Sequence, residues 1–290
     1  MRRFLTVLVV LLMVGAWAGM VVSVFPSKFG STLEKAPPAF STTLTGEHER
    51  VETMQLEYAG FLSVSNQLGQ VYIEGADTDQ ITLRVVKKAK TGLRSAAYLL
   101  DQITVETAVS AGRTQVVGRV PRTRDNEQVS LDLFLTVPRE LIADLKVNLG
   151  TVEVKNVSGT LRIDDDLGSI RIYDFQGNAF IQADLGSVEI HNAEFADNLQ
   201  VAASMGDVEI RGRLARSSVI ENRLGAVKLF LPKGEAYELE AGVDLGSLEI
   251  LVPFDGDRTT DKATGILGEG DIRGTLSLMV SLGSLRIDYQ

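Results

Sequence analysis

The sequence predicts an all-β fold: a parallel β-solenoid of about eight short two-strand coils, capped N-terminally by a mainly β segment with one short helix, after an N-terminal transmembrane helix. Three observations support this prediction. A glycine motif recurs every 18 to 21 residues in the second half of the chain, apolar and polar residues alternate around each motif, and no helical period is sustained there. Such a repeat is typical of a solenoid, and period-two alternation is typical of half-buried strands.

The first segment, residues 1–25, has the pattern of a membrane signal. Phe4 to Phe25 contains 22 residues without a charge, and Arg2 and Arg3 precede it. About 20 apolar residues span a bilayer as a helix, and flanking arginines favour a cytoplasmic N-terminus. We therefore expect a single-pass signal-anchor in the cell membrane, with the rest of the chain extracytoplasmic. The alternative is secretion after cleavage near Ala18, because Ala16–Ala18 has the small-x-small form of a cleavage site.

Two segments separate this anchor from the repeats. Residues 26–50 contain Pro26, Pro37, Pro38 and several Ser and Thr without a clear apolar period, which is typical of a linker. Residues 51–147 alternate over most of their length, and the stretch from Ser95 to Ile103 favours a short helix. We interpret residues 51–147 as an N-terminal β-rich cap segment, since the terminal units of a solenoid need one.

The solenoid repeats occupy residues 148–290. Each copy reads polar residue, Leu, Gly, small residue, aliphatic, charged residue, aliphatic, as in Asp184–Ile190. An isolated early copy is Gln67–Ile73, and Gly268–Gly274 is a degenerate one. Glycine allows the positive backbone angle or the close approach that a corner needs. The predicted structural corner glycines are Gly150, Gly168, Gly186, Gly206, Gly225, Gly246 and Gly283.

The repeat also predicts which side chains face the core. One coil cannot bury its own apolar face, so we expect the Leu and the two aliphatic residues of each copy to point inward and stack on the next coil. The charged residue between the aliphatics would then form an exposed column, which in chain order reads Glu153, Arg171, Glu189, Glu209, Lys228, Glu249, Arg273 and Arg286. Stacking in register would place Arg171 beside Glu189.

The last copy, Ser281–Ile287, is followed by only three residues. A terminal rung with nothing over it presents backbone amides and carbonyls that invite another strand. The sequence therefore predicts an interaction edge for a homotypic or envelope-protein contact at Leu285, Arg286, Ile287 and Asp288. The alternative is that an earlier segment, Pro253 to Gly268, folds back over this edge.

Composition argues against several kinds of partner and cofactor. The net charge is −9, and the excess lies in residues 146–290, which carry 14 basic and 23 acidic side chains. Phosphate contacts need clustered Lys and Arg, so we expect no nucleic-acid partner. There is no cysteine and only two histidines, His48 and His191. The run Asp164–Asp166 could offer oxygen ligands to calcium, but Ser204 and Arg223 interrupt the equivalent row, so turn capping is the favoured interpretation.

The same reasoning weighs against an enzyme. A polysaccharide-acting solenoid enzyme needs paired carboxylates in a groove and a platform for the sugar. The repeat half has no tryptophan, and Phe175, Phe195 and Phe230 lie near strand ends, where aromatic residues are more often core. A Gly-x-Ser-x-Gly motif does not occur. We expect no catalytic residue, no cofactor and no metal.

The region from about Val51 to Gln290 resembles the bacterial putative-adhesin family of β-solenoid proteins, the toastrack domain of unknown function. The resemblance rests on Asn66–Gly75, on Leu133–Pro138 before the repeats, and on the Leu-Gly-Ser-Val-Glu-Ile rungs. It implies a surface-exposed, often membrane-anchored module without catalytic residues. We therefore expect a non-enzymatic scaffold or protein-interaction module of the bacterial cell envelope, the alternative being a surface adhesin that binds a glycan or a host or neighbour ligand.

Overall fold

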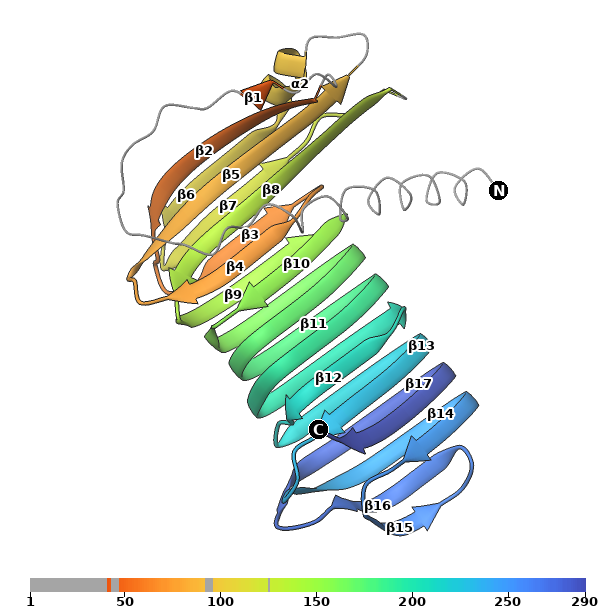
Figure 1. Cartoon of the computed structure of the whole chain (residues 1–290). Helices are drawn as coiled ribbons and strands as arrows, with labels where there is room; N and C mark the ends of the chain where they lie inside the picture. The colour runs from red at the N-terminus through yellow and green to blue at the C-terminus, as the bar shows by residue number, and fades with distance from the viewer. Residues whose placement is uncertain (1–40, 43–46, 92–95, 125) are drawn as a thin grey trace. The chain divides into compact units, whose positions relative to one another are not determined.

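Strands make up nearly all of the protein (Figure 1). The computed structural model describes residues 41–42, 47–91, 96–124 and 126–290. The predicted anchor and most of the predicted linker lie outside these residues. No helix in the described part is long and apolar enough to cross a membrane. The all-β class is confirmed, with the helix α2 (Ala96–Gln102) close to where the sequence predicted one.

The stack of coils begins earlier in the chain than residue 148. Its first coil consists of β3 (Leu62–Asn66) and β4 (Val71–Ala76), and β9 (Glu140–Val147) begins the second coil, so all three strands lie within the segment interpreted as a cap. The early copy at Gln67–Ile73 is therefore the first rung, and β4 pairs in parallel with β10 (Gly150–Lys155). A long excursion of the chain between β4 and β9 separates this rung from the later ones, which explains its isolation in the sequence.

That excursion forms an antiparallel extension at the N-terminal end of the stack. It contains β5 (Gln80–Thr91), β6 (Thr104–Ser110), β7 (Arg113–Arg119) and β8 (Glu127–Pro138). β2 (Glu47–Glu57) pairs with β5 and also with the short β1 (Ser41–Thr42), so regular structure begins before the predicted residue 51. Helix α2 buries Leu99 and Leu100 against β5 and β2.

The later coils form two walls of parallel strands with the core between them. They comprise β10, β11 (Ser158–Met205), β12 (Val208–Arg213), β13 (Ser217–Leu231), β14 (Ala236–Ile250) and β17 (Ile272–Tyr289). We call the wall built from the strands that follow the glycines the rung wall, and the other the opposite wall. The aliphatic residues of each rung are buried as predicted, for example Val188 and Ile190, and Phe175 packs on Phe195 inside with ring centroids 5.8 Å apart.

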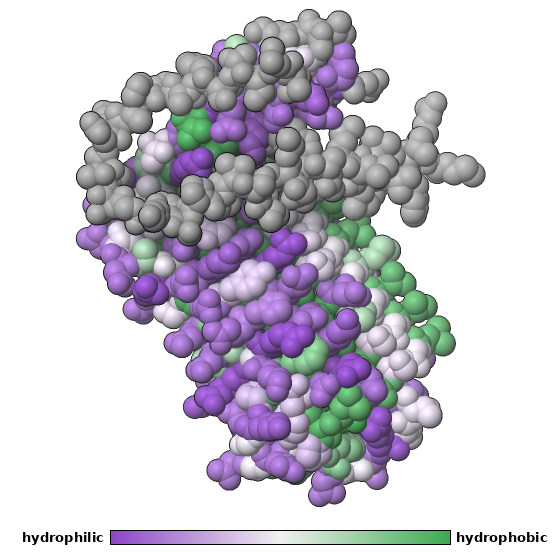
Figure 2. Space-filling view, in the orientation of Figure 1, coloured by the Kyte–Doolittle hydropathy of each residue, from purple (hydrophilic) through white to green (hydrophobic). Residues whose placement is uncertain are grey.

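The residue before the corner glycine is exposed in the last four rungs, which corrects the expectation above for those copies, whereas Leu68 of the first rung packs against the core. Met205, Leu224, Leu282 and Leu245 stand at the corner in four consecutive rungs and are 50, 39, 47 and 67% exposed. Figure 2 shows apolar surface along the right-hand side of the stack, where the rungs begin, beside a mainly hydrophilic wall. The corner turns the chain between the two walls, so the residue before the glycine lies outside both layers.

The order of the last strands also differs from the order in the chain. β17 lies between β13 and β14 and pairs in parallel with both. Leu285 and Ile287 are consequently fully buried, and the interaction edge predicted at Leu285, Arg286, Ile287 and Asp288 is wrong. The hairpin of β15 (Phe254–Arg258) and β16 (Lys262–Gly268) does fold back, but it covers the first half of β14 instead of the last rung.

Register confirms most of the predicted charged column. Its order in space is Glu153, Arg171, Glu189, Glu209, Lys228, Arg286 and Glu249. Arg171 and Glu189 are adjacent, with Nε and Oε2 3.5 Å apart, and Arg286 reaches Glu249 at 3.4 Å. Arg273 is outside the column, because its segment forms a turn and the start of β17, and its guanidinium binds the carbonyl oxygens of Leu214 and Phe195.

Candidate functional sites

The predicted corner glycines form a single column at the start of the rungs. With Gly69 added, their order in space is Gly69, Gly150, Gly168, Gly186, Gly206, Gly225, Gly283 and Gly246. The backbone of each presses on the next: a Cβ on Gly186 would lie 1.4 Å from the carbonyl oxygen of Gly168, and Gly186 has a φ of 144°. Only a residue without a side chain fits there, so these glycines are structural positions.

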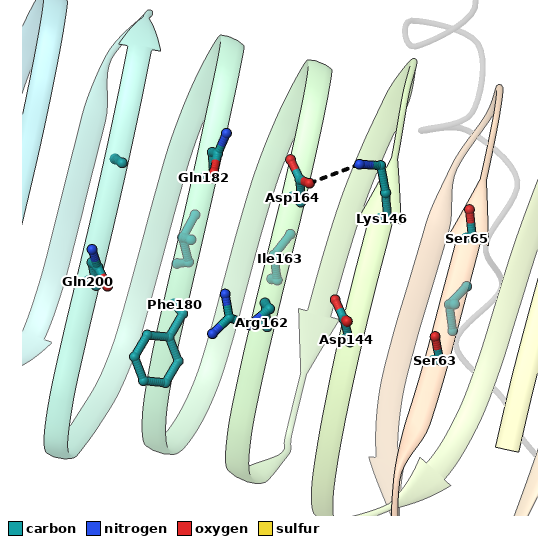
Figure 3. Close-up of a pocket in the computed structure, with 13 residues that line it drawn as sticks. Ser63, Ser65, Asp144, Lys146, Arg162, Ile163, Asp164, Phe180, Gln182 and Gln200 are labelled. Carbon is teal, nitrogen blue, oxygen red and sulfur yellow. Dashed lines mark hydrogen bonds and ion pairs between the residues drawn. The ribbon is translucent and has the colours of Figure 1, made fainter. Parts of the chain in front are cut away.

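A shallow hollow of about 390 Å³ lies on the opposite wall (Figure 3). Register places Ser63, Asp144 and Arg162 in one row across β3, β9 and β11, and Ser65, Lys146 and Asp164 in the next. Later passes of β11 add Phe180, Gln182, Gln200 and Ala202. Strand alternation directs all of these side chains outward, on the face away from the core.

The hollow is polar and its charges balance. The Lys146 ammonium lies 3.2 Å from Asp164 Oδ2, and this hydrogen bond raises the pKa of Lys146 above its usual range. The Arg162 guanidinium lies over the Phe180 ring, 5.2 Å from its centroid. The exposed amides of Gln182 and Gln200 face the same space. With both donors and acceptors beside one aromatic ring, the hollow suits a neutral polar ligand better than a strongly charged one.

The rung wall carries a stripe of cationic and aromatic side chains that sequence reasoning missed. Its members in order are Arg84, Phe134, Tyr72, Lys155, Tyr173, His191, Arg211 and Phe230. Tyr173 and His191 stack at 5.5 Å with 12° between their planes, and the Arg211 guanidinium lies 3.7 Å from the Phe230 centroid. Neighbouring side chains in the stripe thus cover the ring faces on which a sugar would have to stack. The stripe therefore stiffens the wall and does not offer a sugar-binding surface.

Arg84, Phe134 and Tyr72 could not be recognised in the sequence as members of the stripe, since they lie outside the spacing that the other members share. Phe230 is half-buried and faces outward, whereas Phe175 and Phe195 are core residues as predicted. The sequence signal for the other five members is that Lys155, Tyr173, His191, Arg211 and Phe230 each stand five residues after a corner glycine.

The acidic run Asp164–Asp166 is divided by strand alternation. Asp164 and Asp166 point outward, where Asp164 binds Lys146 and Asp166 accepts a hydrogen bond of 2.7 Å from Asn148 Nδ2. Asp165 is buried, its Oδ1 has no hydrogen-bond partner, and burial raises its pKa to about 7, with the charges of Asp166 and Asp164 adding to the effect. In the part of the chain that the structure describes, no group of three His, Cys, Asp or Glu side chains could hold a metal ion.

The chain is similar to a protein family and to several solved structures. A family model described as Toastrack DUF4097 matches residues 61–273. A putative cell adhesion protein from Clostridium sporogenes is 13% identical, with 83% of this chain and 100% of that chain covered and a TM-score of 0.34. A putative adhesin from Bacteroides fragilis is 12% identical, over 82% of this chain and 96% of that chain, with a TM-score of 0.35.

A third solved structure, named as a putative lipid binding protein from Parabacteroides distasonis, is 13% identical over 81% of this chain and 96% of its own, with a TM-score of 0.29. None of the curated proteins matches the chain. The family model alone spans well over half of the residues, and its range includes the strands from β3 to β16. The chain therefore belongs to the Toastrack DUF4097 family, as its rung motifs predicted.

Proposed function

We propose that this chain is a non-enzymatic scaffold or protein-interaction module of the bacterial cell envelope, held at the membrane by residues 1–25 with the stack outside. The observation that carries the proposal is the stack itself. Its rungs lie in register, and the outward side chains of the rung wall bind one another through ion pairs and cation–aromatic contacts. Such a wall favours a stiff support more than a surface that reshapes around a small substrate.

Three measurements test this proposal. Alkaline carbonate extraction followed by N-terminal sequencing should leave the intact chain in the membrane fraction, and a soluble chain that begins at Gly19 would contradict the anchor. Protease digestion of intact and permeabilised cells should show the stack outside the cytoplasmic membrane. Full-length chain bound to beads should then capture a specific protein from envelope extracts, and capture of none would contradict the scaffold.

A second candidate function is binding of a neutral glycan in the hollow on the opposite wall. It is favoured by the amides of Gln182 and Gln200, because amides supply paired donors and acceptors, and Phe180 lines the same hollow. A glycan array should show a ligand that Phe180→Ala loses. The matched control is Ile142→Ala, an exposed apolar residue of the same wall that does not line the hollow. Equal binding by both variants would contradict this candidate.

A further inference from the structure

The far end of the stack has an edge that is only half covered. β14 is the outermost strand, and its first half, Ala236–Gly242, pairs with β16. Its second half, Leu245–Ile250, pairs with β17 on one side and with no other described strand (Figure 1). A sheet edge of this kind leaves backbone donors and acceptors that another strand can satisfy.

The direction of these backbone groups follows from two contacts. The Leu251 N–H donates to the Ile287 carbonyl at 2.9 Å, so Leu251 faces β17. Along a strand, successive residues direct their backbone N–H and C=O groups to opposite sides. The backbone groups of Gly246, Leu248 and Ile250 therefore point to the open side. The Arg258 Nη2 donates to the Leu248 carbonyl at 3.2 Å, which independently marks that carbonyl as open.

The surroundings of the edge form a shallow trough with apolar ends. It is lined by Gly246, Ser247, Leu248, Arg258, Thr259 and Thr260. Leu245 and Leu251, at its two ends, are 67 and 47% exposed. Charge near the middle comes from Glu249, whose carboxylate faces outward on the rung wall.

We propose that Gly246–Ile250 is a strand-addition site for an extended segment of a partner protein, which adds in parallel as the next rung. This deepens the proposed function, since it says where and how a protein partner would bind. The pattern it selects can be read from β17, which lies in register on the other side: Leu282 against Leu245, Ser284 against Ser247, and Arg286 against Glu249. The partner segment therefore needs an apolar residue, then a small polar one, then a basic one, at alternate positions.

The occupant is a different protein instead of a second folded copy. Three rungs of this chain carry a basic residue at the required position, those of Arg171, Lys228 and Arg286. Each of these three strands already lies between two neighbouring rungs. None of them therefore has an unpaired edge that could add to a second molecule. Arg258 acts as a removable cap on the site, because an incoming N–H would compete with its guanidinium for the Leu248 carbonyl.

The test uses the full-length chain in mild detergent and a fluorescent peptide with the sequence of Ser281–Asp288, beside a scrambled peptide. We expect saturable binding of the first peptide alone. Arg258→Ala should tighten binding by about threefold or more, because one competing hydrogen bond is removed. Leu245→Lys should weaken it by about tenfold, through loss of an apolar contact. Leu224→Lys, an exposed corner residue away from the edge, is the matched control and should change binding little.

Hydrogen exchange on the complex separates addition from displacement of β17. If the peptide adds to the edge, the Leu248 and Ile250 amides should become protected from exchange. If it instead displaces β17, Arg258→Ala should not change the affinity for the peptide. Absence of peptide binding, or equal losses in Leu245→Lys and Leu224→Lys, would overturn the strand-addition site. If an envelope protein binds the chain equally well in wild type, Leu245→Lys and Arg258→Ala, the site is refuted while the scaffold function stands.

Discussion

Replacing Asp165 with Asn should stabilise the protein in a pH-dependent way. Asp165 is 2% exposed, and one carboxylate oxygen has no partner. It stands three residues before a corner glycine, as Asn66 and Asn222 do, and Asn222 Nδ2 donates to the Gly206 carbonyl of the preceding rung at 2.9 Å. By repeat equivalence, Asn at position 165 would donate to the carbonyl of Gly150, a bond that the carboxyl group can make only when it is protonated.

The size of the effect follows from the pKa. Burial raises the pKa of Asp165 to about 7 in the folded protein, against an ordinary value of 3.8. The folded state therefore binds the proton more tightly than the unfolded chain. This contribution to stability is fully present below about pH 4 and is lost as the pH rises through about 7. A shift of about 3 pKa units corresponds to up to about 4 kcal/mol of unfolding free energy lost by the wild type.

The assay is urea unfolding of both proteins between pH 4 and pH 8. We expect Asp165→Asn to equal the wild type within about 1 kcal/mol at pH 4 and to exceed it by about 3–4 kcal/mol at pH 8. Asp184→Asn, an exposed position, is the control and should change the unfolding free energy by less than about 0.5 kcal/mol. A difference between Asp165→Asn and wild type that is the same at both pH values would refute the reasoning.

Two further predictions test the stacking. Gly186→Val should lower the unfolding free energy by more than about 3 kcal/mol, because its Cβ would overlap the Gly168 carbonyl, whereas Ser187→Ala should cost less than about 1 kcal/mol; equal melting temperatures would contradict the glycine column. Arg171→Glu places like charges beside Glu189 and should destabilise by about 0.5–1 kcal/mol at low salt, with the loss shrinking at 1 M salt. A loss independent of salt would show that the pair acts by packing instead of charge.

The sequence by itself determined the repeat, the two-strand coils and the inward aliphatic residues. These properties are local: alternation decides which side chains share a face, and a glycine at each start tolerates the contact between rungs. Val188, Ile190 and Gly186 all lie where the motif predicted. Because every copy repeats the same local rule, one copy is enough to infer the others.

The tertiary structure alone decided the order of the last rungs and the chemistry that depends on it. Ser281–Ile287 and Asp244–Ile250 have nearly the same motif, so either fits beside β13, and only pairing over the whole end of the chain selects β17 as its neighbour. The open edge is consequently at β14, and not at the strand of Arg286 as the sequence predicted. The contacts of Phe134 with Arg84 and Tyr72 likewise join β8 to β5 and β4, a pairing that the repeat motif does not encode.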